Sequence, residues 1–272
     1  MEAIQLSGAL PVPEHSTLRV CDNCETPATG KFCVNCGQEH EPSKLHFKDF
    51  VVDYIRSLID IDSRSLKSIR WLVFKPGLLD AQYIQGKRAS YVSPSQIYLC
   101  MSIIFFFVAS QFDPLTLENS AELLNPADLE AIYATQKMTA TEVDALFQEK
   151  VHDHLPAFLM VVVPILALFL GALYRSGKKY YFVHHLTFSY HFFAFLFLIL
   201  IPGNFNEDLA SIGLLSLFVY LWIALKKAYE ESLLTSGLKA GITWILVILL
   251  LYAYLDFSVN YTIGEIKADV GL

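Results

Sequence analysis

The sequence predicts an all-α integral membrane protein with about five transmembrane helices, and three observations lead to this fold class. Of the 272 residues, 54% are hydrophobic and only 17% are charged, and the mean hydropathy is +0.42. Such a composition is too apolar for an ordinary water-soluble domain. The apolar residues gather in long windows with few or no charged side chains, and basic residues lie between alternate windows. This distribution suits a chain whose solvent is lipid.

Five apolar windows are long enough to be transmembrane helices, at residues 94–112, 156–174, 185–201, 209–225 and 240–256. At about 1.5 Å per residue, the shortest windows reach roughly 26 Å, slightly less than the usual hydrocarbon thickness. We expect these helices to stand nearly upright or to thin the bilayer. A re-entrant pair formed by the third and fourth windows is the alternative.

The Lys and Arg residues beside the windows predict the orientation. Basic side chains are dense before the first window, between the second and third, and between the fourth and fifth. Positively charged loops tend to remain in the cytoplasm, and five spans place all three segments on one side. The inner segments then sum to +4 and the outer ones to −11, which together give the net charge of −7. We expect a cytosolic N-terminus and an external C-terminus.

The chain therefore divides into four predicted parts: a tail and cytosolic ribbon at 1–43, an amphipathic juxtamembrane linker at 44–93, a five-helix domain at 94–256 with an external loop at 113–155, and an external tail at 257–272. The loop has helix-start signals at Asn125 and at Thr139 or Thr141 before Glu142, so two short helices are expected there. The acidity of the loop indicates a solvated face, with a surface for a cation or a basic partner as the alternative.

The linker before the first window has helical apolar spacing in two stripes. The first consists of Phe47, Phe50, Val51, Tyr54, Ile55 and Leu58, and the second of Leu66, Ile69, Leu72 and Val73. Arg70, Trp71 and Lys75 flank the second stripe, which suits a helix in the headgroup layer of the inner leaflet. Packing against the transmembrane helices of the same chain is an equal alternative.

The strongest local motif is "CDNCETPATGKFCVNCGQ", which contains Cys21, Cys24, Cys33 and Cys36. Two Cys-x-x-Cys turns together form a tetrahedral site of four thiolates, which suits structural Zn²⁺ and leaves no position open for water. The first residues lack the features of a secretory signal, so the cysteines are expected in the reducing cytosol, where a metal explains them better than disulfides. An iron–sulfur centre or a redox dithiol is the less favoured alternative.

The ribbon is not expected to bind nucleic acid. Between residues 15 and 44, three basic residues stand against four acidic ones, so the positive surface needed to neutralise phosphates is missing. A protein-binding or spacer role is the better prediction.

A second candidate site lies in "VHHLTFSYHFFAF", where His184 and His185 open the third window and His191 lies deeper. His184 and His191 fall on one side of a helix. Intramembrane histidines suggest a metal ligand, a haem ligand or a proton carrier. The alternative is that His184 and His185 lie at the membrane interface and His191 hydrogen-bonds a neighbouring helix.

Five further basic residues beside the windows, Lys75, Lys87, Arg88, Lys178 and Lys179, are expected to bind lipid phosphates or to fix the topology. The "GKR" at 86–88 is not a phosphate-binding loop, because the required glycine spacing and following Ser or Thr are absent.

Taken together, the "CxxC…FCxxCGQ" head, the linker pattern "PG…YIQGKR…Y..P" and the segment "HHLTFSYHFFAFLF" resemble a family of bacterial inner-membrane proteins of unknown function. Members of that family pair a short zinc ribbon with a multi-span domain. The resemblance runs from Cys21 to about Pro202 and implies a bacterial inner membrane and a zinc-binding head. It implies no activity, so no catalytic residue is assigned.

Two functions follow as expectations. The first is a non-enzymatic scaffold, regulator or sensor whose cytosolic zinc ribbon docks a protein partner. The protein is also expected to contact membrane lipids, and a homo-oligomer is an open alternative. The second is a small transporter or membrane oxidoreductase that uses His184, His185 and His191.

Overall fold

The computed structural model describes residues 19–28, 30–40, 63–112, 130, 139–175, 180–205 and 207–270. Its elements are strands β1 (Arg19–Val20) and β2 (Pro27–Ala28), helices α2 (Ser63–Phe74), α3 (Leu78–Ile84), α4 (Pro94–Phe112), α6 (Ala140–Leu173) and α7 (Phe182–Leu200), the 3₁₀ helix η3 (Ile201–Asn204), and helices α8 (Glu207–Ala228) and α9 (Leu233–Val270). The stripe predicted at 47–58, the helix start at Asn125, and Lys178 and Lys179 lie outside these ranges.

Helices make up nearly all of the described fold, and four of them are long and apolar enough to cross a membrane. These four segments are Pro94–Gln111, Phe182–Asn204, Ser211–Ala228 and Leu233–Asp269. The window predicted at 156–174 is the second half of α6, where the apolar stretch Leu159–Leu173 is shorter. The prediction of an all-α membrane protein is confirmed.

Helix α9 is much longer than its apolar window and continues to Val270, so most of the segment expected as a tail is helical. The window missed this extension because polar residues lower the local hydropathy without interrupting a helix. Helices α7 and α8 are also each long enough to span separately, with η3 between them.

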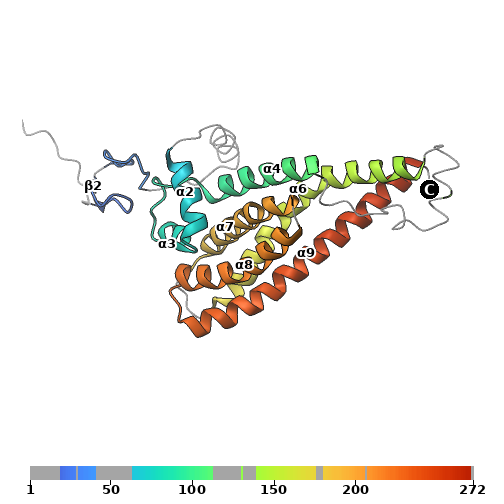
Figure 1. The fold of residues 1–272 in the computed structure, drawn as a ribbon. Coiled ribbons are helices and arrows are strands. Elements are labelled where there is room, and N and C mark those ends of the chain that lie inside the picture. The colour runs from blue at the N-terminus through green and yellow to red at the C-terminus, as the bar shows by residue number, and fades with distance from the viewer. Residues whose placement is uncertain are drawn as a thin grey trace, which may run out of the picture.

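Helix α7 lies at the centre of the bundle, with α4, α6 and α8 packed against it (Figure 1). Every side chain from residue 191 to residue 197 is buried. Helix α7 also contains the buried polar residues His185, Thr187, Ser189 and His191, and polar side chains in a membrane domain favour the interior of the bundle, which explains the central position of α7. The short helix α3 packs on α7 and α8 at the end of the bundle near the strands.

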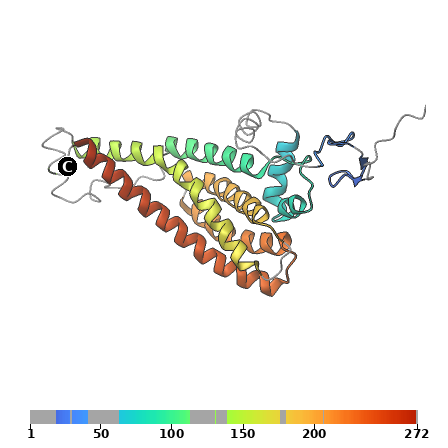
Figure 2. The ribbon, with the colours of Figure 1, turned by 180° about the vertical axis from the view of Figure 1, so that it is seen from behind.

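Helices α6 and α9 run antiparallel and extend together beyond the other helices, as the views from both sides show (Figures 1 and 2). A small core of Val143, Phe147, Val151 and Ile266 joins them there. Lys150 Nζ lies 2.8 Å from Asp269 Oδ2. The predicted start at Thr139 is confirmed by a capping box with Glu142, but the helix that begins there is not short, since it continues to Leu173.

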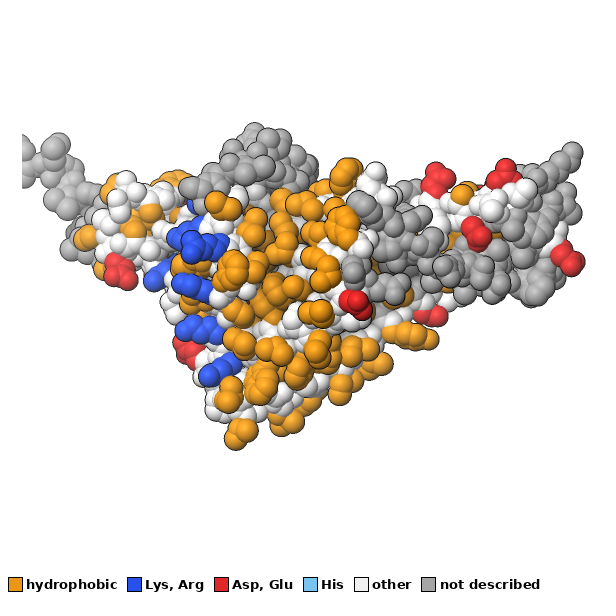
Figure 3. Space-filling view, viewed as in Figure 1, with side chains coloured by type: hydrophobic (Ala, Val, Ile, Leu, Met, Phe, Trp, Pro, Cys, Tyr) orange, Lys and Arg blue, Asp and Glu red, His pale blue; other side chains and the backbone are white. Residues whose placement is uncertain are grey.

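On the face shown in Figure 3, exposed apolar side chains form a broad belt across the bundle. Phe107, Leu215 and Leu249 are 67%, 74% and 58% exposed. A contiguous apolar surface of this kind is rare on a water-soluble monomer and natural in lipid. Lys and Arg side chains gather along one edge of the belt, and acidic side chains lie at both ends of this face, more of them towards the opposite end.

Helix α2 lies across the basic edge of the bundle. Ile69 and Leu72 pack into the core, and the Tyr220 hydroxyl donates to the Leu72 carbonyl at 2.9 Å. Leu66 is 75% exposed, so the bundle covers only part of the predicted stripe. Because successive residues rotate by about 100°, Leu66 lies at the edge of the stripe, beyond the arc that the bundle covers.

Candidate functional site

The four predicted metal ligands come together in the structure. The Sγ atoms of Cys21, Cys24, Cys33 and Cys36 all lie within 4.8 Å of one another, and none is in a disulfide. The Sγ separations are 3.6 Å for Cys21 and Cys36 and 3.5 Å for Cys24 and Cys33. Tetrahedral coordination by sulfur at about 2.3 Å would place the sulfurs about 3.8 Å apart. The cluster can therefore hold a tetrahedral metal ion with little movement.

Two equivalent backbone turns present these thiols. The amide of Glu25 donates to the Cys21 carbonyl, and the amide of Gly37 donates to the Cys33 carbonyl, both at 2.8 Å. Gly37 has φ +72° and Glu25 has φ +60°, so a non-glycine residue adopts the left-handed conformation in the first turn. This strain is consistent with a turn whose conformation is imposed by its ligand.

The thiols differ in acidity. Hydrogen bonding with Thr26 lowers the pKa of Cys24 to about 6, whereas burial raises the pKa of Cys21 to about 11. A bound cation would favour the thiolate at every position. Since all four ligands come from the protein, the site is closed to substrate and suits a structural metal.

The cysteine ribbon, defined here as described residues 19–28 and 30–40, is docked on the loop formed by residues 86–90. Gln38 is 8% exposed, and its side chain donates to the Gly86 carbonyl at 2.9 Å and accepts from the amides of Arg88 and Ala89, each at 3.2 Å. The Ser90 hydroxyl donates to Asn23 at 2.9 Å. One side chain of the ribbon thus satisfies three backbone groups of the loop.

The second candidate site is a buried hydrogen bond between His191 in α7 and Asp80 in α3. His191 Nδ1 donates to Asp80 Oδ1 at 2.7 Å, and both side chains are less than 5% exposed. His191 Nε2 is buried and has no hydrogen-bond partner among the described residues. Charged groups at this depth are costly unless paired, and they often mark a functional position in membrane proteins.

Sequence reasoning missed Asp80, which it placed in the linker rather than beside the histidines. Asp80 is the single acidic residue of segment 63–112, in the apolar stretch "LLDAQYI", and this isolation was the available signal. The two partners are 111 residues apart, so their contact depends on α3 folding back on the bundle.

Close packing fixes α3 in this position. Gly77 begins it with φ +72°, and a Cβ at this residue would lie 2.2 Å from the Ala224 carbonyl oxygen in α8. The ring of Tyr83 meets His191 edge-on at 6.0 Å, and its hydroxyl donates to the Val92 carbonyl. Burial raises the pKa of Tyr83, which keeps this hydroxyl protonated as a donor.

His185 and His184 have partners of their own. His185 is buried, and its Nδ1 lies 2.8 Å from the Tyr229 hydroxyl. His184 is half-buried at the start of α7, where its Nδ1 accepts from the Tyr181 amide. The three predicted histidines therefore have separate contacts. Among the described residues, the four cysteines are the one group of at least three candidate metal ligands.

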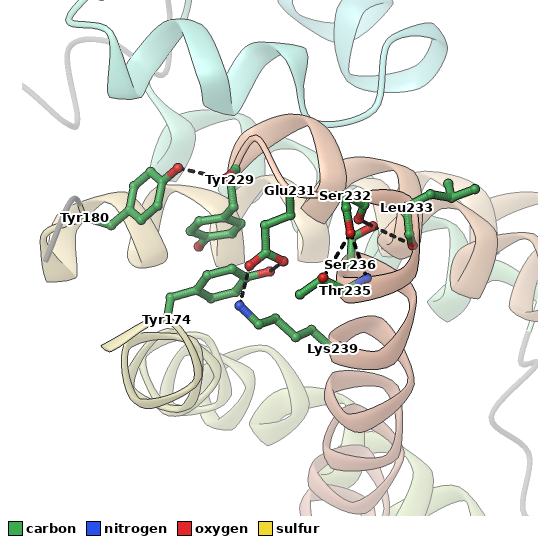
Figure 4. Close-up of polar contacts among 9 residues, drawn as sticks. All are labelled: Tyr174, Tyr180, Tyr229, Glu231, Ser232, Leu233, Thr235, Ser236 and Lys239. Carbon is green, nitrogen blue, oxygen red and sulfur yellow. Dashed lines mark hydrogen bonds and ion pairs between the residues drawn. The ribbon is translucent and has the colours of Figure 1, made fainter. Parts of the chain in front are cut away.

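An aromatic and ionic cluster surrounds Tyr229 where α6, α7, α8 and α9 meet (Figure 4). Tyr174 stacks on Tyr229 with ring centroids 3.8 Å apart, and Tyr180 donates to the Tyr229 carbonyl. Lys239 pairs with Glu231, and its ammonium lies 3.8 Å from the Tyr174 ring centroid. The cluster fastens four helix ends together and leaves its ionic groups paired.

Of the basic residues expected beside the spans, the three that the structure describes, Lys75, Lys87 and Arg88, lie at the same end of the bundle as the ribbon. Lys75 and Arg88 are exposed, and Lys87 is half-buried in the loop that Gln38 contacts. They flank α2 and α3 rather than lining the His191 pair.

The fold and these sites define a multi-span, all-α membrane protein with a cysteine ribbon able to hold a metal ion. Residues 62–106 match the model of a family described as "Protein of unknown function (DUF3667)". The match covers α2, α3 and most of α4, including Asp80 and the 86–90 loop. No curated protein and no solved structure shows a significant match.

Proposed function

We propose that this chain is a non-enzymatic scaffold or regulator of a bacterial inner membrane, whose zinc ribbon is held on the membrane domain and docks a cytosolic protein partner. The observation that carries the proposal is the contact of Gln38 with three backbone groups of the 86–90 loop. These hydrogen bonds hold the ribbon in a fixed position on the membrane domain.

Zinc is the proposed metal because four thiolates in a tetrahedral arrangement suit it by ligand type and geometry. A segment of this size has little core of its own, and metal binding would supply the folding free energy that the core lacks.

The surface of the ribbon supports a protein partner. Val20, Phe32 and Val34 are 61%, 53% and 91% exposed. Exposed apolar side chains on a small module are typical of a protein-binding surface. The cytosolic location rests on the basic edge beside the ribbon, which the positive-inside tendency places in the cytoplasm.

The first test concerns the metal. Cys33→Ser/Cys36→Ser removes two of the four proposed ligands and should lose the single zinc of the chain, read by metal analysis of the purified protein. Without the metal the ribbon should also leave the 86–90 loop. A disulfide crosslink between cysteines placed at Asn23 and Ser90 reports that contact and should weaken in the variant.

The second test concerns the docking surface. Val34→Asp should keep zinc and the contact with the loop but lose a crosslinked partner. Asn35→Asp adds the same charge at the neighbouring exposed position and should keep the partner, so it serves as the charge control. An interactome that neither Val34→Asp nor the Cys33/Cys36 variant changes would overturn the proposal.

A second function, proton-coupled transport or membrane redox chemistry, is favoured by the buried pair of His191 and Asp80. His191 Nε2 is buried and has no hydrogen-bond partner among the described residues, which suits a proton carrier or a metal or haem ligand. A haem absorption band, or metal that survives in the cysteine variants, would support the redox form. Loss of a growth or uptake phenotype in His191→Ala, with normal expression, would support metal-free transport; normal growth and uptake would count against it.

A further inference from the structure

The exposed side of α2 contains a hollow that the proposed function does not use. It has a volume of about 440 Å³, and among the described residues it is lined by Arg70, Trp71, Phe74 and Lys75. Arg70, Phe74 and Lys75 are exposed, and Trp71 is half-buried. The hollow thus combines two cations with two aromatic rings on one short segment.

The cations of this hollow are available for an anion. Within the described part of the chain, Arg70 and Lys75 have no ion-pair partner, and Lys75 Nζ lies 5.1 Å from the Trp71 ring centroid. Lys67 lies over the same ring at 5.3 Å. Trp71 therefore lies close to two ammonium groups, and Arg70 and Lys75 line the hollow together, a pair of cations that fits a phosphate group.

The position of the hollow matches the boundary between lipid and water. Leu72 anchors α2 in the core, while Leu66 and Phe74 are 75% and 77% exposed. The Lys and Arg side chains form an edge along the apolar belt at this end of the bundle (Figure 3). Tryptophan favours the same interfacial depth. An occupant of the hollow would meet cations on its polar side and apolar side chains on the other.

We propose that Arg70, Trp71, Phe74 and Lys75 form a binding site for the phosphate headgroup of an anionic phospholipid in the leaflet at the basic edge. Arg70 and Lys75 bind the phosphate oxygens, and Phe74 contacts the glycerol and upper acyl region. Apolar exposure beside the cations favours a lipid over a free phosphate ion. This site is independent of the cysteine ribbon and its partner.

The test uses the full-length protein in detergent, with phosphatidylglycerol or phosphatidylcholine added and retention measured by native mass spectrometry. Phosphatidylglycerol should be retained in preference to phosphatidylcholine. Arg70→Gln/Lys75→Gln should weaken that retention about 30-fold, because each basic side chain near an anionic surface contributes about fivefold. Lys226→Gln/Lys227→Gln removes the same charge from the end of α8 and should leave retention nearly unchanged.

A charge-preserving exchange, Arg70→Lys/Lys75→Arg, guards against misfolding and should retain most of the binding. Equal losses in the α2 and α8 variants would overturn the site in favour of general electrostatic attraction. Equal retention of the two lipids would overturn it as well. Complete displacement of phosphatidylglycerol by millimolar inorganic phosphate would identify a free-phosphate site instead of a lipid site.

Discussion

At the scale of single residues, the contact between His191 and Asp80 joins two buried polar side chains at 2.7 Å. Both side chains are buried, so each loses hydration that the other must replace. The pair also connects α3 to the central helix, because Asp80 belongs to α3 and His191 belongs to α7.

Removal of one partner of this pair should destabilise the bundle strongly. Asp80→Ala leaves His191 buried without its acceptor and should cost about 3–5 kcal/mol of unfolding free energy. The double variant Asp80→Leu/His191→Phe removes both polar groups and should recover much of that loss. Thermal unfolding in detergent measures both, with exposed Asp256→Asn as the control. Additive losses in the double variant would contradict the coupling.

Gly77 gives a second prediction at this scale. Gly77→Ala places a Cβ against the Ala224 backbone at a positive φ, so overpacking alone should cost about 1–3 kcal/mol. The control is Gly241→Ala, where a Cβ meets nothing within 4 Å and alanine favours the helix. Melting temperatures should fall for the first variant and stay level or rise for the second. A reversed order would refute the close contact of α3 with α8.

At the scale of elements, α6 shows how a local signal defines the start of a long helix. The Thr139 amide donates to the Glu142 carboxylate at 2.7 Å, and the Glu142 amide donates back to the Thr139 hydroxyl at 3.4 Å. These bonds satisfy two of the free donors at the helix start. From there, apolar packing with α9 and then α7 carries the helix into the bundle.

The capping box predicts acid-sensitive fraying at this end of α6. The hydrogen bond from the Thr139 backbone lowers the pKa of Glu142 below its usual value of 4.5. The stabilisation is therefore present above that pH and is lost as the pH falls through the lowered pKa. Amides of the first turn should exchange faster, relative to their intrinsic rates, at pH 3 than at pH 6. Glu142→Gln should remove the pH dependence, and a change as large as that of the parent would contradict the mechanism.

At the scale of the whole molecule, charge is sorted along the bundle. Many of the basic side chains lie near α2 and the end of α8, whereas the α6 and α9 extension carries more acidic than basic side chains, with Lys150 paired to Asp269 there. A membrane that retains positive segments in the cytoplasm would hold the protein in one orientation. We therefore expect the ribbon to face the cytosol and the paired ends of α6 and α9 to face outside.

Reporter fusions test this orientation. Alkaline phosphatase fused after Leu272 should be active and green fluorescent protein at the same site dark, because the C-terminus is expected outside. After Glu230, in the turn between α8 and α9, the pattern should reverse. The opposite pattern at both positions would show an inverted topology.

The sequence by itself determined the membrane class, the cluster of four cysteines that can hold a metal ion, and the start of α6, because these depend on composition, on close spacing along the chain and on local hydrogen bonds. The sequence also predicted the linker helix α2, but not that the bundle covers Leu72 and leaves Leu66 exposed. Helix lengths were underestimated, since hydropathy reports lipid contact rather than backbone structure.

The tertiary structure alone decided the partners of the histidines and of the ribbon. Asp80 meets His191, and Gln38 meets the 86–90 loop, through contacts between residues far apart in sequence. Such contacts depend on how α3 packs against α7 and α8, which is set by the combined shape of many side chains. The spacing of residues along the chain does not predict that shape. The sequence therefore did not identify Asp80, a residue of the linker, as the buried partner of His191.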